Sequence, residues 1–402
     1  MPPPDSFVLG SLSVERFLQK YWQKEPLVVR QAFPGLSDPL TPDELAGLAC
    51  EPHVDSRLVM QRGGARPWQV TRGPQRAKDL RALPPSHWTL LVESVDRHCD
   101  DIAAFSTAFS FLPRWRMDDV MVSLAPVHGT VDAHIDSYDV FLIQGQGRRR
   151  WEVDRRAIPD YQPGLDLRIL KRFRVEDSWV LDPGDMLYVP PGVGHRGVTV
   201  PSDAAVALTY SVGFRAPSTG DLLSSLLTHA LASEVPRLFS DRGRGPAPDP
   251  GELSSSDLVA LRRFLLKSID APESLAWTLA AGEAVTTGGA LRPPAGRITA
   301  RNVAARLEAG ALLAPVPGAR ITWTRHDPGR AILFVNGESR VLPRAQAFAA
   351  SFLCGQGSPA VARRIASNAA LLALVVDLLR AGVLAFSPMD ATSTRPGRRL
   401  RP

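Results

Sequence analysis

The sequence is poor in cysteine and lysine, and it contains no long apolar run. Its three cysteines, Cys50, Cys99 and Cys354, are widely spaced and form no C-x-x-C pair, which excludes a disulfide framework and favours a reducing compartment. The amino terminus has neither the basic nor the apolar region of a signal peptide, and no apolar run reaches the roughly 18 residues of a membrane span. We therefore expect a cytoplasmic protein without a membrane segment.

Because lysine is scarce, arginine provides nearly all of the basic residues behind the formal net charge of +6. Arginine suits phosphate recognition, but arginines scattered over solvated faces give the same composition. Composition alone thus leaves an anionic partner open. With 44% hydrophobic and 22% charged residues, the 402-residue chain can form two or three domains with buried cores.

Short β-prone runs separated by proline, glycine and aspartate fill the first 215 residues and predict a sandwich or barrel. We therefore expect this part of the chain to have a mainly β fold. Helices are expected at 13–21 and 41–49, each behind a serine or threonine cap. The β-prone runs lie at 26–30, 120–124, 139–144, 150–153, 178–181, 185–189 and 204–212.

Leucines recur at helical spacing in 219–234 and 254–269. These two helices form too thin a layer to fold alone, so we expect them to pack against the barrel or against a second copy of the chain. Further on, Asn336-Gly337 between apolar runs predicts a hairpin. Helices are expected at 300–312, 344–353, 359–367 and 369–381, and helices combined with a hairpin suggest a winged helix.

These patterns divide the chain into a β-rich domain with amino-terminal helices (1–215), a helical region (216–272), a winged-helix-like domain (273–388) and a tail (389–402). The tail holds four arginines without apolar periodicity, and we expect it to be disordered.

The first candidate metal ligands are found in His134-Ile-Asp136. Their i, i+2 spacing in a strand places an imidazole and a carboxylate on one face. His195 follows a strand between two turns, Asp182-Pro-Gly and Pro190-Pro-Gly, and lies where the chain re-enters the sheet. Two histidines and one aspartate form the facial triad of non-haem Fe(II) oxygenases. Zinc could bind the same residues, but no general base stands out beside them.

The remaining histidines show no paired ligand spacing, and we expect each of them to be structural or on the surface. They are His53, His87, His98, His128, His229 and His326.

Together, His134-x-Asp136 and the run Gly-Asp-x-x-x-x-Pro-x-Gly-x-x-His that ends at His195 resemble the JmjC double-stranded β-helix of the cupin superfamily. The stretch from Asp136 to Trp151 is similar to that of the bacterial ribosomal oxygenases. The resemblance implies a JmjC barrel, a helical dimerisation region and a carboxy-terminal winged helix. It also implies Fe(II)-dependent hydroxylation with 2-oxoglutarate and O2 as cosubstrates, with His134, Asp136 and His195 as metal ligands, in a homodimer.

2-Oxoglutarate has a distal carboxylate that needs a buried cation. Arg148, Arg149 and Arg150 are consecutive, and strand alternation does not say which of them points inward. The resemblance assigns this role to Arg149, and Ser123 is a candidate hydroxyl donor to the same carboxylate. Arg148 and Arg150 are then expected on a solvated face and Trp151 in packing.

The substrate that the resemblance implies is an arginine side chain of the large-subunit ribosomal protein L-sixteen. By motif position, Asp119 would hold the guanidinium, Met121 and Tyr138 would line its methylenes, and Ser211 would make a polar contact.

Three other functions remain open. A related branch of ribosomal oxygenases modifies histidine. N-methyl demethylation uses the same chemistry, although no aromatic cage is visible beyond Tyr138. A nucleic-acid-binding winged helix would need a basic recognition helix, whereas 369–381 is almost entirely apolar. We therefore expect no sequence-specific nucleic-acid binding.

Overall fold

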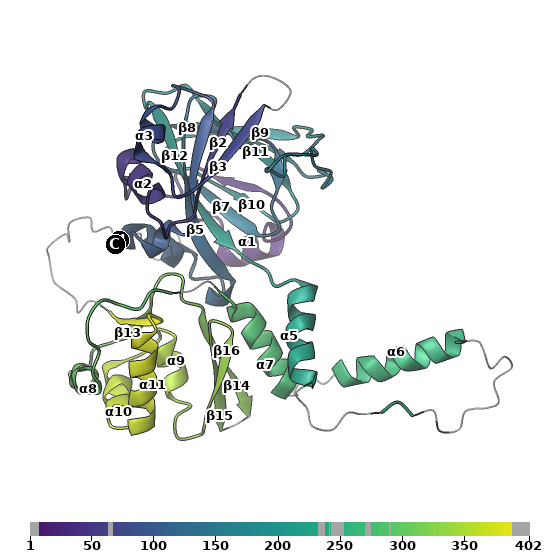
Figure 1. Cartoon of the computed structure of the whole chain (residues 1–402), viewed down its shortest axis with the longest axis vertical. Coiled ribbons are helices and arrows are strands. Elements are labelled where there is room, and N and C mark those ends of the chain that lie inside the picture. The colour runs from purple at the N-terminus through teal and green to yellow at the C-terminus, as the bar shows by residue number, and fades with distance from the viewer. Residues whose placement is uncertain are drawn as a thin grey trace. The chain divides into compact units, whose positions relative to one another are not determined.

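The computed structural model separates into two compact units, one ending at Ala216 and the other beginning at Pro217 (Figure 1). The predicted tail at 389–402, the amino-terminal residues and most of the loop at 241–251 lie outside the described residues. In the described part of the chain, no helix is both long and apolar enough to cross a membrane. The structure describes residues 8–62, 67–231, 238–240, 242, 253–269, 275–288, 291–327 and 329–387.

The first unit contains two antiparallel sheets that pack face to face, as the β-prone runs predict. The larger sheet has the order β1-β10-β7-β12-β5-β4-β2-β3 and the smaller one β6-β11-β8-β9. The strands are β1 (Leu27–Val29), β2 (Ser56–Gln61), β3 (Trp68–Arg72), β4 (Trp88–Val92), β5 (Met117–Pro126), β6 (His134–Ile135), β7 (Asp139–Gln144), β8 (Arg148–Asp154), β9 (Asp177–Leu181), β10 (Met186–Val189), β11 (Gly194–Val200) and β12 (Val206–Phe214).

The central part of the larger sheet is buried on both faces, and β7 shows this at every residue. Val140 and Leu142 face the smaller sheet, whereas Phe141 and Ile143 pack in the core beneath the amino-terminal helices. Burial on two faces explains why β7 reads as a continuous apolar run without alternation.

The two predicted amino-terminal helices are confirmed, as α1 (Val14–Lys20) and α2 (Pro42–Ala49). Ser13 caps α1, and Thr41 forms a capping box with Glu44 at the start of α2. Two short helices follow, α3 (Ala77–Arg81) and α4 (Asp100–Ala103).

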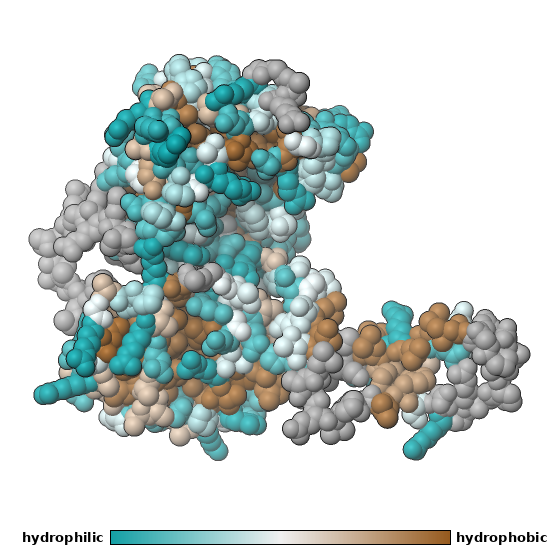
Figure 2. Space-filling model, viewed as in Figure 1, coloured by the Kyte–Doolittle hydropathy of each residue, from teal (hydrophilic) through white to brown (hydrophobic). Residues whose placement is uncertain are grey.

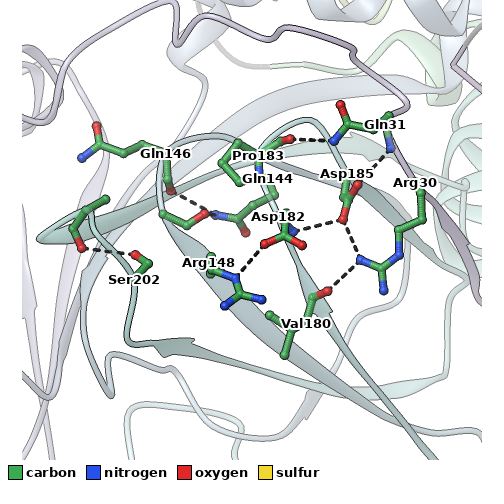
Figure 3. A network of polar contacts seen from close by, with 12 residues as sticks. Arg30, Gln31, Gln144, Gln146, Arg148, Val180, Asp182, Pro183, Asp185 and Ser202 are labelled. Atoms are coloured by element: carbon green, nitrogen blue, oxygen red, sulfur yellow. Dashed lines mark hydrogen bonds and ion pairs between the residues drawn. The ribbon is translucent and has the colours of Figure 1, made fainter.

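The turn before β10 is held by a buried carboxylate (Figure 3). Asp185 accepts hydrogen bonds from the backbone N–H of Gln31 at 2.9 Å and of Asp182 at 3.0 Å, and from Arg30 at 2.6 Å. Gly184 has φ +88, and a Cβ there would lie 2.6 Å from a backbone oxygen of Phe33, so only glycine fits. This network fixes β10, which leads into the strand that carries His195.

The second unit combines helices with a three-stranded antiparallel sheet. The predicted hairpin is confirmed, since Asn336 and Gly337 have φ 50 and 87 and join two paired strands. The elements are α5 (Thr219–Leu231), α6 (Ser255–Ile269), α7 (Leu275–Thr286), α8 (Ala300–Glu308), β13 (Leu313–Pro315), β14 (Ile321–Asp327), β15 (Arg330–Val335), β16 (Glu338–Leu342), α9 (Ala349–Leu353), α10 (Pro359–Ala366), α11 (Ala369–Arg380) and β17 (Leu384–Phe386).

Two helices of this unit are shorter than the sequence predicts. The helix expected at 300–312 ends at Glu308, because Gly310 adopts φ +86 just beyond it. The helix expected at 344–353 forms only from Ala349, and the preceding residues make turns in which the backbone N–H groups of Gln346 and Ala347 donate to Pro343.

Candidate active site

The three predicted metal ligands converge on one point of the first unit. Strand pairing places His195 on β11 directly opposite His134 on β6, and Asp136 follows β6 immediately. The Nε2 atoms of His195 and His134 lie 3.6 and 3.9 Å from Oδ2 of Asp136. All three ligand atoms lie within 4.8 Å of one another, which suits coordination of a single ion.

Backbone carbonyls orient both imidazoles. Nδ1 of His134 lies 2.9 Å from the carbonyl oxygen of Asp132, and Nδ1 of His195 lies 3.2 Å from that of Val193. Since a carbonyl only accepts, each Nδ1 carries the proton and each Nε2 presents its lone pair to the site. Burial, assisted by the neighbouring His134, lowers the pKa of His195 to about 4 and keeps its imidazole neutral. The donor set therefore fits a divalent metal such as iron.

Arg149 is a buried cation that lacks a counter-charge. Its side chain is 3% exposed, and burial lowers its pKa to about 10. Nη1 donates to Oγ of Ser123 at 3.0 Å across the two sheets, but Nε has no hydrogen-bond partner. No carboxylate within the described residues forms an ion pair with it. Desolvating a guanidinium in this way is costly unless an anion binds, so these residues fit the distal carboxylate of 2-oxoglutarate.

Gly197 and Thr199 belong to this site, although the sequence motifs do not single them out. A Cβ at Gly197 would lie 2.7 Å from both Nε of Arg149 and the Trp151 ring, so glycine makes room for both side chains. Thr199 lies opposite Arg149 in the strand pairing, and its hydroxyl is buried without a partner, as is Nε1 of Trp151. Alternation along β11 is the signal that finds them, because residues 195, 197 and 199 share one face.

Alternation along β8 also explains why the residues on either side of Arg149 point away from the cavity. Arg148 is exposed and bonds to Asp182 at 2.6 Å, and Arg150 pairs with Glu152 at 3.2 Å on the outer face, as expected. Trp151 packs between the sheets, as expected, and also lines the cavity at the metal triad.

A cavity of about 600 Å³ brings all of the predicted site residues together. On β5, alternate residues from position 119 to position 123 face it, and strand β12 places Ser211 beside Met121. Its lining includes Asp119, Met121, Ser123, His134, Asp136, Tyr138, Arg149, His195 and Ser211.

The far end of this cavity is acidic. Asp119 and Ser123 are four positions apart along β5, about 13 Å at the rise of a strand. Asp119 accepts hydrogen bonds from the backbone N–H and the hydroxyl of Ser94, at 2.8 and 3.0 Å. Burial raises its pKa to about 7, and the nearby charges of Asp96, Asp118 and Glu93 add to the effect. The cavity thus has a cationic end at Arg149 and an acidic end suited to a cation.

Burial also raises the pKa of the Tyr138 phenol above its usual range, and the carboxylate of Asp136 adds to this. The phenol therefore stays neutral and can pack against an apolar chain while its hydroxyl donates a hydrogen bond.

The double-sheet barrel, the two-histidine, one-carboxylate triad and the buried arginine define a 2-oxoglutarate-dependent oxygenase of the JmjC class, and a model of the JmjC domain matches residues 104–222. In sequence, the chain is 40% identical over 259 residues to the ribosomal protein uL16 3-hydroxylase of Escherichia coli K12, covering 64% of this chain and 67% of that one. The chain belongs to the family of bacterial ribosomal oxygenases.

Solved structures agree with this assignment. The crystal structure of E. coli YcfD superposes with a TM-score of 0.80 at 33% identity, covering 94% of this chain and 99% of that one. A structure of YcfD in complex with cobalt and 2-oxoglutarate superposes with a TM-score of 0.76 at 33% identity, covering 94% and 98% of the two chains.

Proposed function

We propose that the protein is an Fe(II)- and 2-oxoglutarate-dependent oxygenase that hydroxylates an arginine side chain of the large-subunit ribosomal protein uL16. The observation that carries this proposal is a single cavity with a metal triad, a buried unpaired cation at one end and a buried carboxylate at the other. The similarity to the ribosomal protein uL16 3-hydroxylase of E. coli supports this substrate.

His134, Asp136 and His195 would hold the iron, which together with 2-oxoglutarate and O2 supplies the oxidising chemistry for C–H hydroxylation. Arg149 and Ser123 would hold the distal carboxylate of the cosubstrate. The apolar side chains between the two sheets keep water away from this end and strengthen the charged contact.

The substrate arginine would enter from the acidic end of the cavity. The carboxylate of Asp119 can accept two N–H groups of the guanidinium. Met121 and Tyr138 would pack against the methylenes, and the Ser211 hydroxyl would provide a polar contact. Positioning of the target carbon near the metal is the main contribution of the protein to the reaction.

The test is incubation of the full-length protein with Fe(II), 2-oxoglutarate, O2 and a uL16 peptide, followed by tandem mass spectrometry. We expect one added oxygen on an arginine, and no product with His134→Ala. An added oxygen on histidine would instead indicate a histidyl hydroxylase, and loss of a methyl group with formaldehyde from a methylated peptide would indicate a demethylase. Either result without arginine hydroxylation contradicts the proposal.

We also propose that the protein is a cytoplasmic homodimer with domains at 1–215, 216–272 and 273–388. Leucines of α5 and α6 support the dimer, since Leu227 and Leu265 are 58% and 59% exposed, and Figure 2 shows hydrophobic residues along α6. The helices α8, α10 and α11 with the hairpin of β15 and β16 suit a winged helix, and α11 suits no role as a groove-reading recognition helix because it buries most of its large apolar residues in the core of this unit.

A further inference from the structure

The positive charge of the chain is concentrated in one stretch. Residues 1–216 contain 25 lysines and arginines against 27 aspartates and glutamates, a balance of −2. Residues 291–387 contain twelve arginines and no lysine against four carboxylates, a balance of +8. A basic excess confined to one part of a chain indicates a local interaction with an anionic partner.

A second cavity lies within this basic stretch, between α8, β17 and the end of α11, and has a volume of about 590 Å³. Its walls are largely apolar, and no aspartate or glutamate is among the described residues that line it. The apolar walls come from Ile298, Val303, Leu379, Leu384 and Phe386.

Two exposed arginines, Arg297 and Arg306, line this cavity, and a third, Arg380, donates to the backbone of the lining residue Ile298. The guanidinium carbon of Arg306 lies 3.7 Å from the centre of the Phe386 ring, so the ring holds the guanidinium while its N–H groups remain available. Arg380 donates through Nε at 3.3 Å and Nη2 at 3.0 Å to the carbonyl oxygen of Ile298, which leaves Nη1 free to bind. Arg297 lines the cavity directly. Within the described part of the chain, no carboxylate forms an ion pair with any of the three.

The arginines at the rim and the apolar interior of the cavity indicate which kind of ligand it can bind. Arginine groups at the rim suit phosphates, which they contact through several N–H donors. An apolar interior of this size suits a flat aromatic group such as a nucleobase. A simple inorganic anion has no such group and would leave the interior unfilled. The chain's own carboxy-terminal segment is a poor occupant, because residues 388–402 hold four arginines and one aspartate. Charge complementarity therefore favours a nucleic acid, in which phosphates and bases alternate along the chain.

We propose that this arginine-bordered cavity binds single-stranded RNA, with phosphates on Arg297, Arg306 and Arg380 and a base against the apolar wall. Such binding depends on the backbone and on stacking, so it needs no basic recognition helix and reads no sequence. This function is separate from the proposed hydroxylation and uses none of its residues.

The test is fluorescence anisotropy of the full-length protein with a labelled single-stranded RNA of twelve nucleotides, at several salt concentrations. The variant Arg297→Gln/Arg306→Gln/Arg380→Gln removes the three rim charges. The matched control Arg325→Gln/Arg340→Gln/Arg344→Gln removes three exposed charges elsewhere in the same stretch. Thermal melting and peptide hydroxylation report whether each variant is folded.

We expect wild type to bind the RNA and the rim variant to bind at least about tenfold more weakly, with a salt slope of log K shallower by about 2, as expected for three lost phosphate contacts. The control variant should lose affinity clearly less. Equal losses in both variants, or no binding by wild type, overturn the proposal. So does displacement of the RNA by polyglutamate or by AMP at matched concentration, since these would identify an acidic protein or a free nucleotide as the ligand.

Discussion

At the scale of single residues, the catalytic cavity depends on charges that the fold buries before any ligand arrives. Arg149 and Asp119 lie at opposite ends of the same cavity. Arg149 donates a hydrogen bond to Ser123, and Asp119 accepts one from the hydroxyl of Ser94. Neither side chain forms an ion pair among the described residues. A ligand with an anionic end and a substrate with a cationic end would compensate both.

Gly197 should control binding of the cosubstrate. In Gly197→Ala, the new Cβ meets Arg149 and Trp151 at 2.7 Å, so both side chains must move. We expect the Kd for 2-oxoglutarate to rise at least about tenfold, because the arginine fork is displaced, while metal affinity changes little. Isothermal titration with metal and then with 2-oxoglutarate measures both.

Gly47→Ala is the control for this substitution, because nothing lies within 4 Å of a Cβ at that position in α2. It should leave both affinities unchanged. Equal loss of metal binding in Gly197→Ala would show that the glycine supports the fold rather than the cosubstrate site.

Asp119 should make substrate binding dependent on pH. Its pKa of about 7 means that the peptide-free protein holds the proton below that pH, when the carboxyl offers no charge to an arginine. We expect the KM for the peptide to fall by about tenfold as pH rises from 6 to 8. Asp119→Asn should have a high KM throughout this range; a variant that keeps the wild-type profile would remove Asp119 from the site.

The same carboxyl also affects stability, with the opposite dependence on pH. The folded pKa of Asp119 lies above its ordinary value of 3.8, so the unfolded chain releases the proton first as pH rises and the free energy of unfolding falls between about pH 4 and 7. At pH 8 without peptide, Asp119→Asn should therefore melt at a higher temperature than wild type. Its amide oxygen can still accept the Ser94 hydrogen bonds.

At the scale of elements, the turn at Asp182 to Asp185 anchors the strand that precedes the last metal ligand. Burial raises the pKa of Asp185, but hydrogen bonds from Gln31, Asp182 and Arg30 outweigh it and leave the pKa below its usual value. We expect Asp185→Asn to lower the free energy of unfolding by about 1–3 kcal/mol, because buried donors lose their acceptor. Denaturant titration measures this loss.

Asp182→Asn is the matched control, since its ion pair with Arg148 is exposed and contributes about 0–1 kcal/mol. Because the folded pKa of Asp185 is depressed, the stabilisation is present above pH 4 and is lost as pH falls through the folded pKa. The wild-type and Asp185→Asn curves should therefore converge in acid. A constant difference down to pH 2 would contradict this origin.

The elements also show where a single sequence is informative. Capped helices and the Asn336-Gly337 hairpin could be predicted because each depends on local chemistry. Helix α7 could not, because it is apolar on several sides and packs against both α5 and the three-stranded sheet, so it has no clear periodicity. The triad could be predicted from spacing. Alternation places Gly197 and Thr199 on the same face as His195, but their contacts with Arg149 and Trp151 could not be predicted, because these depend on the pairing of β11 with β8.

At the scale of the whole molecule, charge and exposed apolar surface are distributed unevenly along the chain. The net charge of +6 conceals a slightly acidic first unit and a strongly basic stretch at 291–387. Exposed large apolar side chains instead gather on α5 and α6, where Leu223, Leu258 and Leu265 are all more than half exposed. Exposed apolar side chains that recur along one helix, as they do on α6, indicate a protein interface.

A dimer through α6 leads to a prediction about assembly. Leu258→Asp/Leu265→Asp should shift the protein from dimer to monomer in sedimentation velocity, because each carboxylate would be desolvated in an apolar interface. Ser256→Asp, on the same helix, should leave the dimer intact. If wild type sediments as a monomer, this interface does not exist.

The uncompensated charge of Arg149 links cosubstrate supply to the lifetime of the protein. A ligand that binds only the folded barrel adds RT ln(1 + [L]/Kd) to its free energy of unfolding, about 2.7 kcal/mol at a hundredfold excess over Kd. We therefore expect the enzyme to resist heat and proteolysis best when 2-oxoglutarate is abundant. Without this cosubstrate, the barrel should open more often and be cleaved sooner by proteases.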